Sequence, residues 1–394
     1  MNGDVTSASS FPGTLAVDMD HIAWGKTNRS ESDFRSPGDV ITTPTLGMLA
    51  AMATTSLGDD VFQEDETTTG FESLMASQCG HEAGAFVMSG TMANQLAIRT
   101  LLPQPPCGIL VDVRAHVIHF EGGGIGMSGA SVRTVRPSNG RYMVLEDIIS
   151  RAIVTDDVHK APTKVISIEN TAGGSVVPVS ELRRVSEWAH SNEIKVHMDG
   201  ARLFEAVATG AGSLWDYCTL CDLVSLDFSK NLGAPMGAMV LGSAKDIAQL
   251  RRIRKSLGGG MRQSGPLAAA AQFAVVEQFG IGPWGSRSKL KAVHDLAKRV
   301  GEMWMGLGGE LLREVETNQV WVDLGKAGIK TEEWNELGRK HGVKLDGKRI
   351  VLHHQISMDA VARLENVFNE ARRVRPLHHP RVSDTSNSAS SRVV

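Results

Sequence analysis

Short apolar runs alternate with longer amphipathic stretches along much of the chain. The apolar runs are nearly continuous, which is typical of strands buried on both faces of a sheet. They lie at residues 84–88, 108–113, 164–169, 195–200, 223–228 and 238–242. The stretches at 91–102, 180–192 and 244–257 repeat apolar residues at helical spacing and therefore predict helices. Strands separated by helices favour an α/β fold, with a mostly parallel central sheet covered by helices.

The pattern changes after about residue 266, where helical stretches dominate and the apolar runs become short. We therefore expect a large domain at residues 31–265 and a smaller C-terminal α+β domain at residues 266–374. The smaller domain is predicted to hold long helices and short strands, at 286–307, 358–374, 318–324 and 349–354. Residues 1–30 are interpreted as a mobile arm, and residues 375–394, which hold few large apolar side chains, as a disordered tail.

Composition and charge limit the partners and the location that we expect for this protein, and they leave the predicted fold unchanged. The chain has 394 residues, is 42% hydrophobic and carries a formal net charge of −3, so it has no general attraction to nucleic acid or membranes. Neither a long apolar span nor a signal-peptide pattern is evident, and we expect a cytoplasmic protein. Cys218 and Cys221 form a CxxC motif that lacks a second pair, so we interpret them as buried free thiols and predict no metal site.

Polar residues gather directly after several predicted strands, where open α/β sheets bind their ligands. The turn Ser89–Thr91 feeds a predicted helix, so it fits either an anion-binding site or a simple helix cap. His116 follows the second strand, and a lone histidine is usually structural. Asp199 ends another strand, where a buried carboxylate is unfavourable unless a cation pairs with it. Lys230 follows an apolar strand and precedes a turn rich in glycine and proline.

Taken together, these residues match what pyridoxal phosphate requires. A lysine can form a Schiff base with the cofactor aldehyde, and an aspartate can keep the pyridine nitrogen protonated. Lys230 and Asp199 are the candidates, with the Gly90–Thr91 turn for the phosphate. The strand before Lys230 gives it a rigid base, and the glycine and proline after it leave room for the ring. A solvated surface lysine, the alternative, would not follow such an apolar run.

Several long motifs resemble the threonine aldolases, which are pyridoxal-phosphate enzymes of the aspartate-aminotransferase-like fold type I. The similarity is greatest to their fungal members, some of which are alanine racemases. It covers roughly residues 34–370 and rests on motifs such as GDDVFQED, SGTMANQLAIRT, IENTAGGSVVP, HMDGARLFEA and SKNLGAPMGAMVLG. The resemblance implies a large cofactor-binding domain and a smaller C-terminal domain.

The resemblance also implies roles for individual residues of the cofactor site. Lys230 would form the Schiff base, Asp199 would hold the pyridine nitrogen, and His116 would stack on the ring and serve as a candidate base. The residues expected to contact the cofactor are Lys230, Asp199, His116, Gly90, Thr91, Ser229 and Arg262. Arg262 would reach the cofactor of a neighbouring subunit. A homo-oligomer, at least a dimer and in this family usually a tetramer, is therefore expected.

For the substrate carboxylate, the resemblance points to Arg202 and Arg349, with Ser36 beside them. A guanidinium group suits such a role because it can bind a carboxylate through two parallel hydrogen bonds. The alternative for Arg202 is an ion pair with a nearby carboxylate of the protein. The alternative for Arg349 is a solvated position on its strand.

Three departures from the family pattern lie on the side where a substrate hydroxyl would bind. Phe62 stands where a tyrosine is usual. The IENT motif lacks the histidine that usually follows within two residues, and Gly173 lies there instead. Pro37 and Gly38 interrupt the usual Arg-Ser-Asp-Thr motif.

These observations leave three functions open. The first is retro-aldol cleavage of L-threonine or L-allo-threonine to glycine and an aldehyde through Lys230. The second is racemisation of a small amino acid such as L-alanine, which needs no hydroxyl site and so fits Phe62 and Gly173. The third is an inactive family member that acts as a binding subunit, against which intact Lys230 and Asp199 argue.

Overall fold

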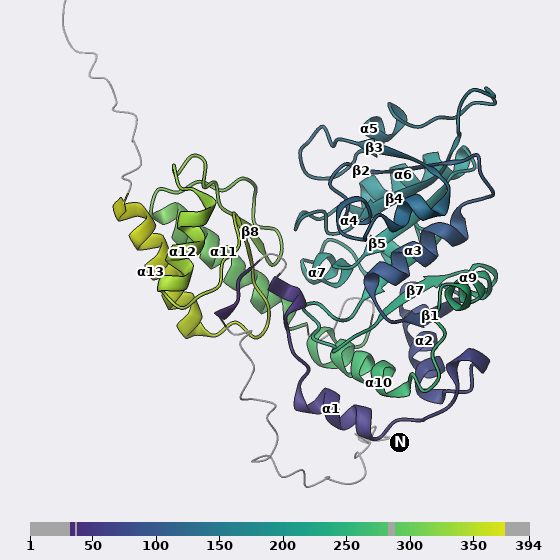
Figure 1. The fold of residues 1–394 in the computed structure, drawn as a ribbon, viewed down its shortest axis with the longest axis horizontal. Coiled ribbons are helices and arrows are strands. Elements are labelled where there is room, and N and C mark those ends of the chain that lie inside the picture. The colour runs from purple at the N-terminus through teal and green to yellow at the C-terminus, as the bar shows by residue number, and fades with distance from the viewer. Residues whose placement is uncertain (1–31, 36–37, 283–287, 375–394) are drawn as a thin grey trace, which may run out of the picture.

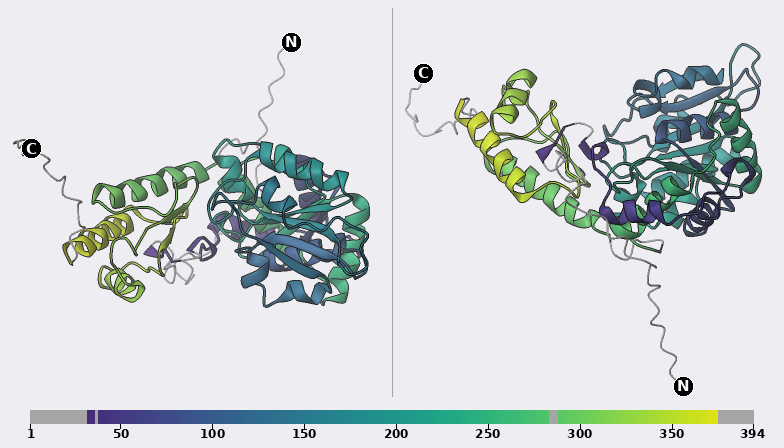
Figure 2. Two further views of the ribbon diagram at one scale, coloured as in Figure 1. Left: turned by 90° about the horizontal axis from the view of Figure 1, so that it is seen from above. Right: turned by 60° about the horizontal axis from the view of Figure 1, so that its bottom comes forward.

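The structure of this chain is a computed structural model, which describes residues 32–35, 38–282 and 288–374. The predicted arm at 1–30 and the predicted tail at 375–394 lie outside these residues, as does Ser36. The described chain folds into two parts, seen side by side in Figures 1 and 2. Among the described residues, no helix has the length and apolar character needed to cross a lipid bilayer.

A seven-stranded sheet forms the centre of the larger part, with strand order β1-β7-β6-β5-β4-β2-β3. The strands are β1 Ala83–Val87, β2 Gly108–Asp112, β3 Ser131–Val135, β4 Thr163–Glu169, β5 Lys195–Gly200, β6 Leu223–Asp227 and β7 Ala238–Gly242. Only β7 runs antiparallel to its neighbours β1 and β6. The predicted mostly parallel α/β sheet is confirmed, while the edge strand β3 was not predicted.

Helices cover both faces of this sheet (Figure 1). They are α1 Leu46–Ala53, α2 Glu66–Cys79, α3 Gly90–Leu101, α4 His116–His119, α5 Leu145–Ile149, α6 Val179–Ser191, α7 Leu203–Ala208, α8 Leu214–Cys218, α9 Ala244–Ser256 and α10 Gly265–Ala274. Successive strand residues point to opposite faces, so Val165 joins one hydrophobic cluster and Ile166 the other. Burial on both faces explains why these strands read as continuous apolar runs.

The smaller part contains α11 Leu290–Gly306, β8 Gln319–Trp321, α12 Thr331–Lys340, β9 Arg349–Val351 and α13 Met358–Val374. Its core stacks the Trp334 ring on the Phe368 ring, with centroids 5.8 Å apart. Phe34, from the N-terminal segment, is fully buried in this same cluster. Helix α10 packs in the core of the larger part, so the core changes near residue 290, after the boundary predicted at residue 265.

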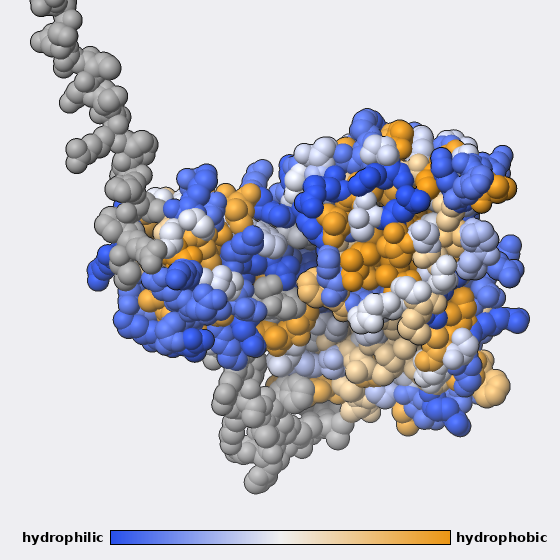
Figure 3. All heavy atoms as spheres, turned by 45° about the horizontal axis from the view of Figure 1, so that its top comes forward, coloured by the Kyte–Doolittle hydropathy of each residue, from blue (hydrophilic) through white to orange (hydrophobic). Residues whose placement is uncertain are grey.

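Strand direction brings the candidate residues to one edge of the sheet. Strands β4, β5 and β6 are parallel, and Glu169 pairs with Asp199 across β4 and β5. Strand β1 is parallel to β6 because both are antiparallel to β7. The ends of β1, β5 and β6 therefore place Ser89, Asp199 and Lys230 on the same side of the molecule. The outer surface of the smaller part is mostly hydrophilic on the face drawn in Figure 3, while apolar residues gather on the larger part.

Candidate active site

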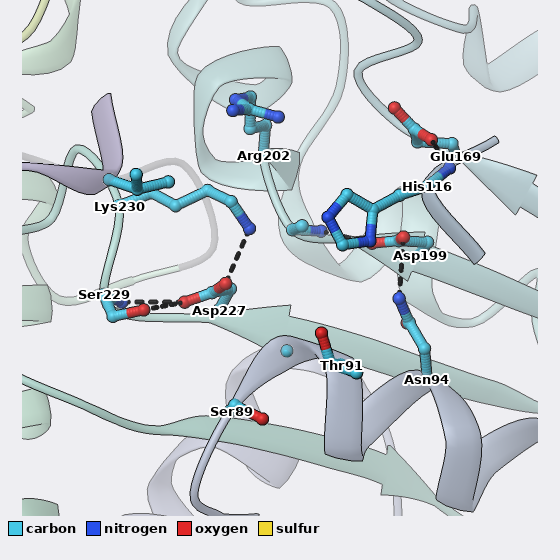
Figure 4. A pocket seen from close by; sticks show the side chains of 13 residues that line it. Ser89, Thr91, Asn94, His116, Glu169, Asp199, Arg202, Asp227, Ser229 and Lys230 are labelled. Carbon is cyan, nitrogen blue, oxygen red and sulfur yellow. Dashed lines mark hydrogen bonds and ion pairs between the residues drawn. The ribbon is translucent and has the colours of Figure 1, made fainter. Parts of the chain in front are cut away.

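A cavity of about 220 Å³ lies at this edge of the sheet (Figure 4). It brings together most of the residues predicted from the sequence. Those that line it are Gly90, Thr91, His116, Asp199, Arg202, Ser229 and Lys230. The cavity also includes residues that the sequence interpretation did not assign, and two of them, Glu169 and Asp227, add carboxyl groups to the site.

Asp199, at the end of β5, carries a buried carboxylate that has only neutral donors around it. Asn94 Nδ2 donates to its Oδ2 at 2.8 Å, and the Ala201 amide donates to its Oδ1 at 3.1 Å. No described cationic side chain forms an ion pair with it. A protonated ring nitrogen would supply the missing positive charge, so the site fits the predicted role of Asp199.

His116 begins α4 and is held by a buried carboxylate. Its Nδ1 lies 2.9 Å from Glu121 Oε1, which also accepts a hydrogen bond from Asn94. This hydrogen bond with Glu121 raises the pKa of His116. Since Asn94 also donates to Asp199, one amide ties the two predicted residues together, as Figure 4 shows in part. Asn94 lies within the quoted SGTMAN motif, yet its partners could not be read from that motif.

Lys230 reaches into the cavity from the turn after β6 (Figure 4). Its Nζ forms an ion pair with Asp227 Oδ2 at 2.6 Å. The Ser229 amide and hydroxyl donate to the other oxygen, Asp227 Oδ1, at 2.8 and 2.7 Å. Although burial opposes ionisation, the Lys230 ammonium holds the pKa of Asp227 below its usual value. Asp227 was not predicted, although it precedes the lysine by three residues in SLDFSKN.

The Ser89–Thr91 turn has features of both a helix cap and an anion-binding site, the two interpretations made from the sequence. Ser89 caps α3, because its hydroxyl accepts from the Met92 amide at 3.2 Å. The amides that follow it begin a helix of 12 residues, whose N-terminus favours an anion. A Cβ atom on Gly90 would lie only 2.8 Å from Asp227 Oδ2, so a larger residue would clash there. The Asp227 carboxylate therefore lies against the turn that is expected to take a phosphate.

Arg202 forms an ion pair with a carboxylate of the protein, which was the alternative to its predicted role as a substrate ligand. Its Nε and Nη2 donate to the two oxygens of Asp39 at 2.7 and 2.8 Å. Asp39 is fully buried and also accepts from Asn318 Nδ2 at 3.2 Å. The remaining N–H groups of Arg202 can still donate toward the cavity that it lines. Its predicted binding of a substrate carboxylate stays a prediction.

Arg349, the other predicted carboxylate ligand, begins β9 in the smaller part. Its guanidinium carbon lies 5.4 Å from the centre of the Trp321 ring. Burial and the neighbouring charge of Arg202 lower the pKa of Arg349 to about 10. Arg349 is half-buried against Trp321 and is therefore not a fully solvated strand position, while its predicted binding of a substrate carboxylate stays a prediction.

Other positions singled out from the sequence lie away from this cavity. Arg262 forms an ion pair with Asp59 at 2.9 Å and its side chain is 77% exposed, so its contact with a second subunit stays a prediction. Phe62 is 73% exposed on a short helix after Asp59. The described cysteines are all buried and free, which confirms the interpretation of the CxxC motif.

Glu169, at the end of β4, is a pocket residue that the sequence interpretation did not assign. Its Oε2 accepts a hydrogen bond from the His116 amide at 3.1 Å. Burial, together with the charge of Asp199, raises the pKa of Glu169 to about 7. The cavity therefore holds a carboxyl group that gains its proton near neutral pH.

Replacing Glu169 with glutamine should change how stability depends on pH. Because the folded-state pKa is raised from 4.5 to about 7, the folded protein keeps a proton that the unfolded chain loses. This contribution is fully present below pH 4.5 and is lost as the pH rises through about 7. The stability of the original protein relative to Glu169→Gln should therefore fall between about pH 5 and about pH 8 in urea unfolding. A constant difference across this range would contradict the raised pKa.

Known proteins resemble this chain over most of its length, and their names include both aldolases and a racemase. A family model described as Beta-eliminating lyase matches residues 33–327. The chain is 55% identical over 360 residues to alanine racemase TOXG of Cochliobolus carbonum, covering 91% of this chain and 92% of that protein. It is 41% identical over 363 residues to the low-specificity L-threonine aldolase of Candida albicans, covering 91% and 94%. The solved structure of Leishmania major threonine aldolase shares the fold, with a TM-score of 0.68 at 18% identity, covering 87% of this chain and 99% of that one.

Proposed function

Because the chain belongs to the β-eliminating lyase family, and within it to the threonine aldolases, we propose that it cleaves L-threonine or L-allo-threonine to glycine and acetaldehyde. Pyridoxal phosphate is the proposed cofactor. The observation that carries the proposal is one cavity with a lysine amine at one side and, at another, a buried carboxylate that no described cation neutralises.

The residues present fit pyridoxal phosphate. Lys230 would carry it, and Asp199 would pair with its ring nitrogen. His116 would lie against the ring, and the N-terminus of α3, with Gly90 and Thr91, would take the phosphate. When bound, the cofactor supplies an electron sink that stabilises negative charge at the substrate Cα.

The protein's own side chains would select the bond that breaks. Arg349 and the remaining N–H groups of Arg202 would hold the substrate carboxylate and so fix the orientation of the Cα substituents. His116, oriented by Glu121, would take the hydroxyl proton directly or through a water molecule as the Cα–Cβ bond breaks. The hydrogen bond with Glu121 raises the pKa of His116, so its unprotonated form binds a proton more strongly while a smaller fraction of it is unprotonated near neutral pH.

Asp227 is the residue that fits the cofactor least well, and this gives a prediction. Its carboxylate lies against Gly90 of the phosphate turn and pairs with Lys230 as an ammonium. Asp227→Asn would remove charge repulsion with a phosphate and release the lysine amine, so the cofactor should bind about tenfold more tightly. Absorbance titration of the cofactor-free protein with pyridoxal phosphate measures this, and unchanged or weaker binding would count against the placement of the phosphate.

The deciding experiment incubates the purified protein and cofactor separately with L-threonine, L-allo-threonine and L-alanine. Chiral chromatography follows glycine, acetaldehyde and D-alanine. Glycine and acetaldehyde without D-alanine would support the aldolase. D-alanine with little glycine would overturn it in favour of the racemase, which has less support because the family description and most named relatives are lyases.

A further inference from the structure

An arginine of the smaller part fills the space beside Gly173, where the family pattern has a histidine nearby. Arg313 Nη1 lies 3.4 Å from the Gly173 carbonyl oxygen. The Arg313 guanidinium carbon lies 4.6 Å from the centre of the Trp321 ring, whose Nε1 donates to the same carbonyl at 2.9 Å. A Cβ atom on Gly173 would approach Arg313 Nη1 to 3.0 Å. The absence of a side chain at this position therefore leaves room for the guanidinium group.

The backbone around Gly173 is suited to this arrangement. Gly173 has a φ of +59° and Gly174 a φ of +92°, values that residues with side chains rarely adopt. A turn of two glycines thus follows β4, whose last residue, Glu169, lines the cavity. Arg313, from the smaller part of the molecule, contacts the first glycine of this turn. The guanidinium group therefore lies beside the loop that leads out of the candidate active site.

The surroundings of Arg313 carry an excess of positive charge. Burial, followed by the charges of Arg114 and Arg141, lowers the pKa of Arg313. Nearby acids already have partners: Asp112 pairs with Arg114 at 2.8 Å, and Glu316 pairs with Arg141 at 2.6 Å. In the described part of the chain, no carboxylate forms an ion pair with Arg313.

Arg349 adds a second positive charge beside Arg313. Its guanidinium carbon lies 5.4 Å from the centre of the same Trp321 ring that Arg313 contacts. Burial, then the charges of Arg202 and Arg313, lower the pKa of Arg349. Asp39, the acid nearest to Arg202, is already engaged by that residue. Arg313 is half-buried and forms no ion pair with a described carboxylate, which is unfavourable for a guanidinium, and an anionic ligand would relieve this.

We propose that Arg313 binds an anionic group on the side chain of the substrate. This rests on the proposed retro-aldol function and narrows its substrates to β-hydroxy-α-amino acids that carry a second carboxylate, such as β-hydroxyaspartate. Arginine suits the role because its planar N–H groups match a carboxylate. Cleavage of the Cα–Cβ bond of β-hydroxyaspartate gives glycine and glyoxylate. The hydroxyl proton leaves to a base, Cα gains a proton, and no oxidant or reductant is needed.

The test compares kcat/KM for L-β-hydroxyaspartate, as both diastereomers, with kcat/KM for L-threonine. The original enzyme should prefer β-hydroxyaspartate. In Arg313→Met the ratio should fall by roughly ten- to a hundredfold, the effect of losing one charge-assisted hydrogen bond, and Arg313→Lys should retain part of it. Arg299→Met, which removes the same charge from an exposed position on α11, should leave the ratio unchanged. The proposal would be overturned if the original enzyme did not prefer β-hydroxyaspartate to L-threonine. It would also be overturned if Arg313→Met left the ratio of the two kcat/KM values unchanged.

A binding measurement separates failure of this proposal from failure of the aldolase assignment. L-aspartate and L-alanine are titrated into the cofactor-loaded protein, and binding is followed by the change in visible absorption. Arg313→Met should weaken binding of L-aspartate at least tenfold more than binding of L-alanine. This result would support the anion site even if no substrate were cleaved. Equal weakening of both ligands would mean that Arg313 acts on the shared carboxylate or on the fold, and would refute the proposal.

Discussion

Replacing Lys230 with alanine is expected to lower threonine cleavage by roughly a thousandfold or more. It should also remove the visible absorption of the lysine-linked cofactor. The reason is that Lys230 carries the one amine among the described residues that line the cavity, and it is held there at the end of a buried strand.

A control must show that the loss of activity and absorption in Lys230→Ala is not a general effect of removing a lysine. Lys245→Ala offers a matched control, because Lys245 is exposed on α9 and lies outside the cavity. Both variants should keep the circular dichroism of the original protein, and only Lys230→Ala should lose activity and absorption together. Activity that persists in Lys230→Ala would show that the cofactor is held elsewhere or is not needed.

Much of the site followed from the sequence because its chemistry lies at strand ends. Asp199 and Lys230 each end a continuous apolar run, and such runs form adjacent strands of one sheet. Their shared edge could therefore be predicted without knowing the strand order. The sequence also indicated the anion turn, because small residues precede a helical pattern there.

The partners of these residues could not be predicted, because they come from distant segments. Asp39 pairs with Arg202 across 163 residues of sequence, and Asn94 reaches Asp199 across 105. Neither contact has a local pattern. Arg313 contacts Gly173 across 140 residues, so its place beside the site depends on how the two parts of the molecule pack.

Parts of the fold were missed for a related reason. Strand β3 lies at the sheet edge, and its residues are mostly half-buried, so it lacks the continuous apolar run of the central strands. Phe34 belongs to the core of the smaller part although it lies near the start of the chain. Helix α10 resembles the later helices in pattern but packs with the larger part. Periodicity identifies the buried face of an element and does not say which core will bury it.

Asp199→Asn is expected to lower threonine cleavage by about a hundred- to a thousandfold, comparable to the loss of one preorganised electrostatic group. The asparagine side chain has nearly the same shape and keeps an oxygen that can accept from the Ala201 amide. It cannot offer a negative charge to a protonated ring nitrogen. The cofactor would then stabilise negative charge at Cα less well, although Lys230 remains in place to hold it.

The same substitution should act in the opposite direction on the cofactor-free protein. Asp199 is 4% exposed, and among the described residues the donors to its carboxylate are the neutral Asn94 side chain and Ala201 amide, so this charge has lost water without gaining an ion-pair partner. Removing that charge should leave the free energy of unfolding unchanged or raise it by about 1–3 kcal/mol. Asp295→Asn, at an exposed position on α11, serves as the control in urea unfolding. A clear loss of stability in Asp199→Asn would mean that this carboxylate serves the fold, and a drop in activity would then say nothing about the ring nitrogen.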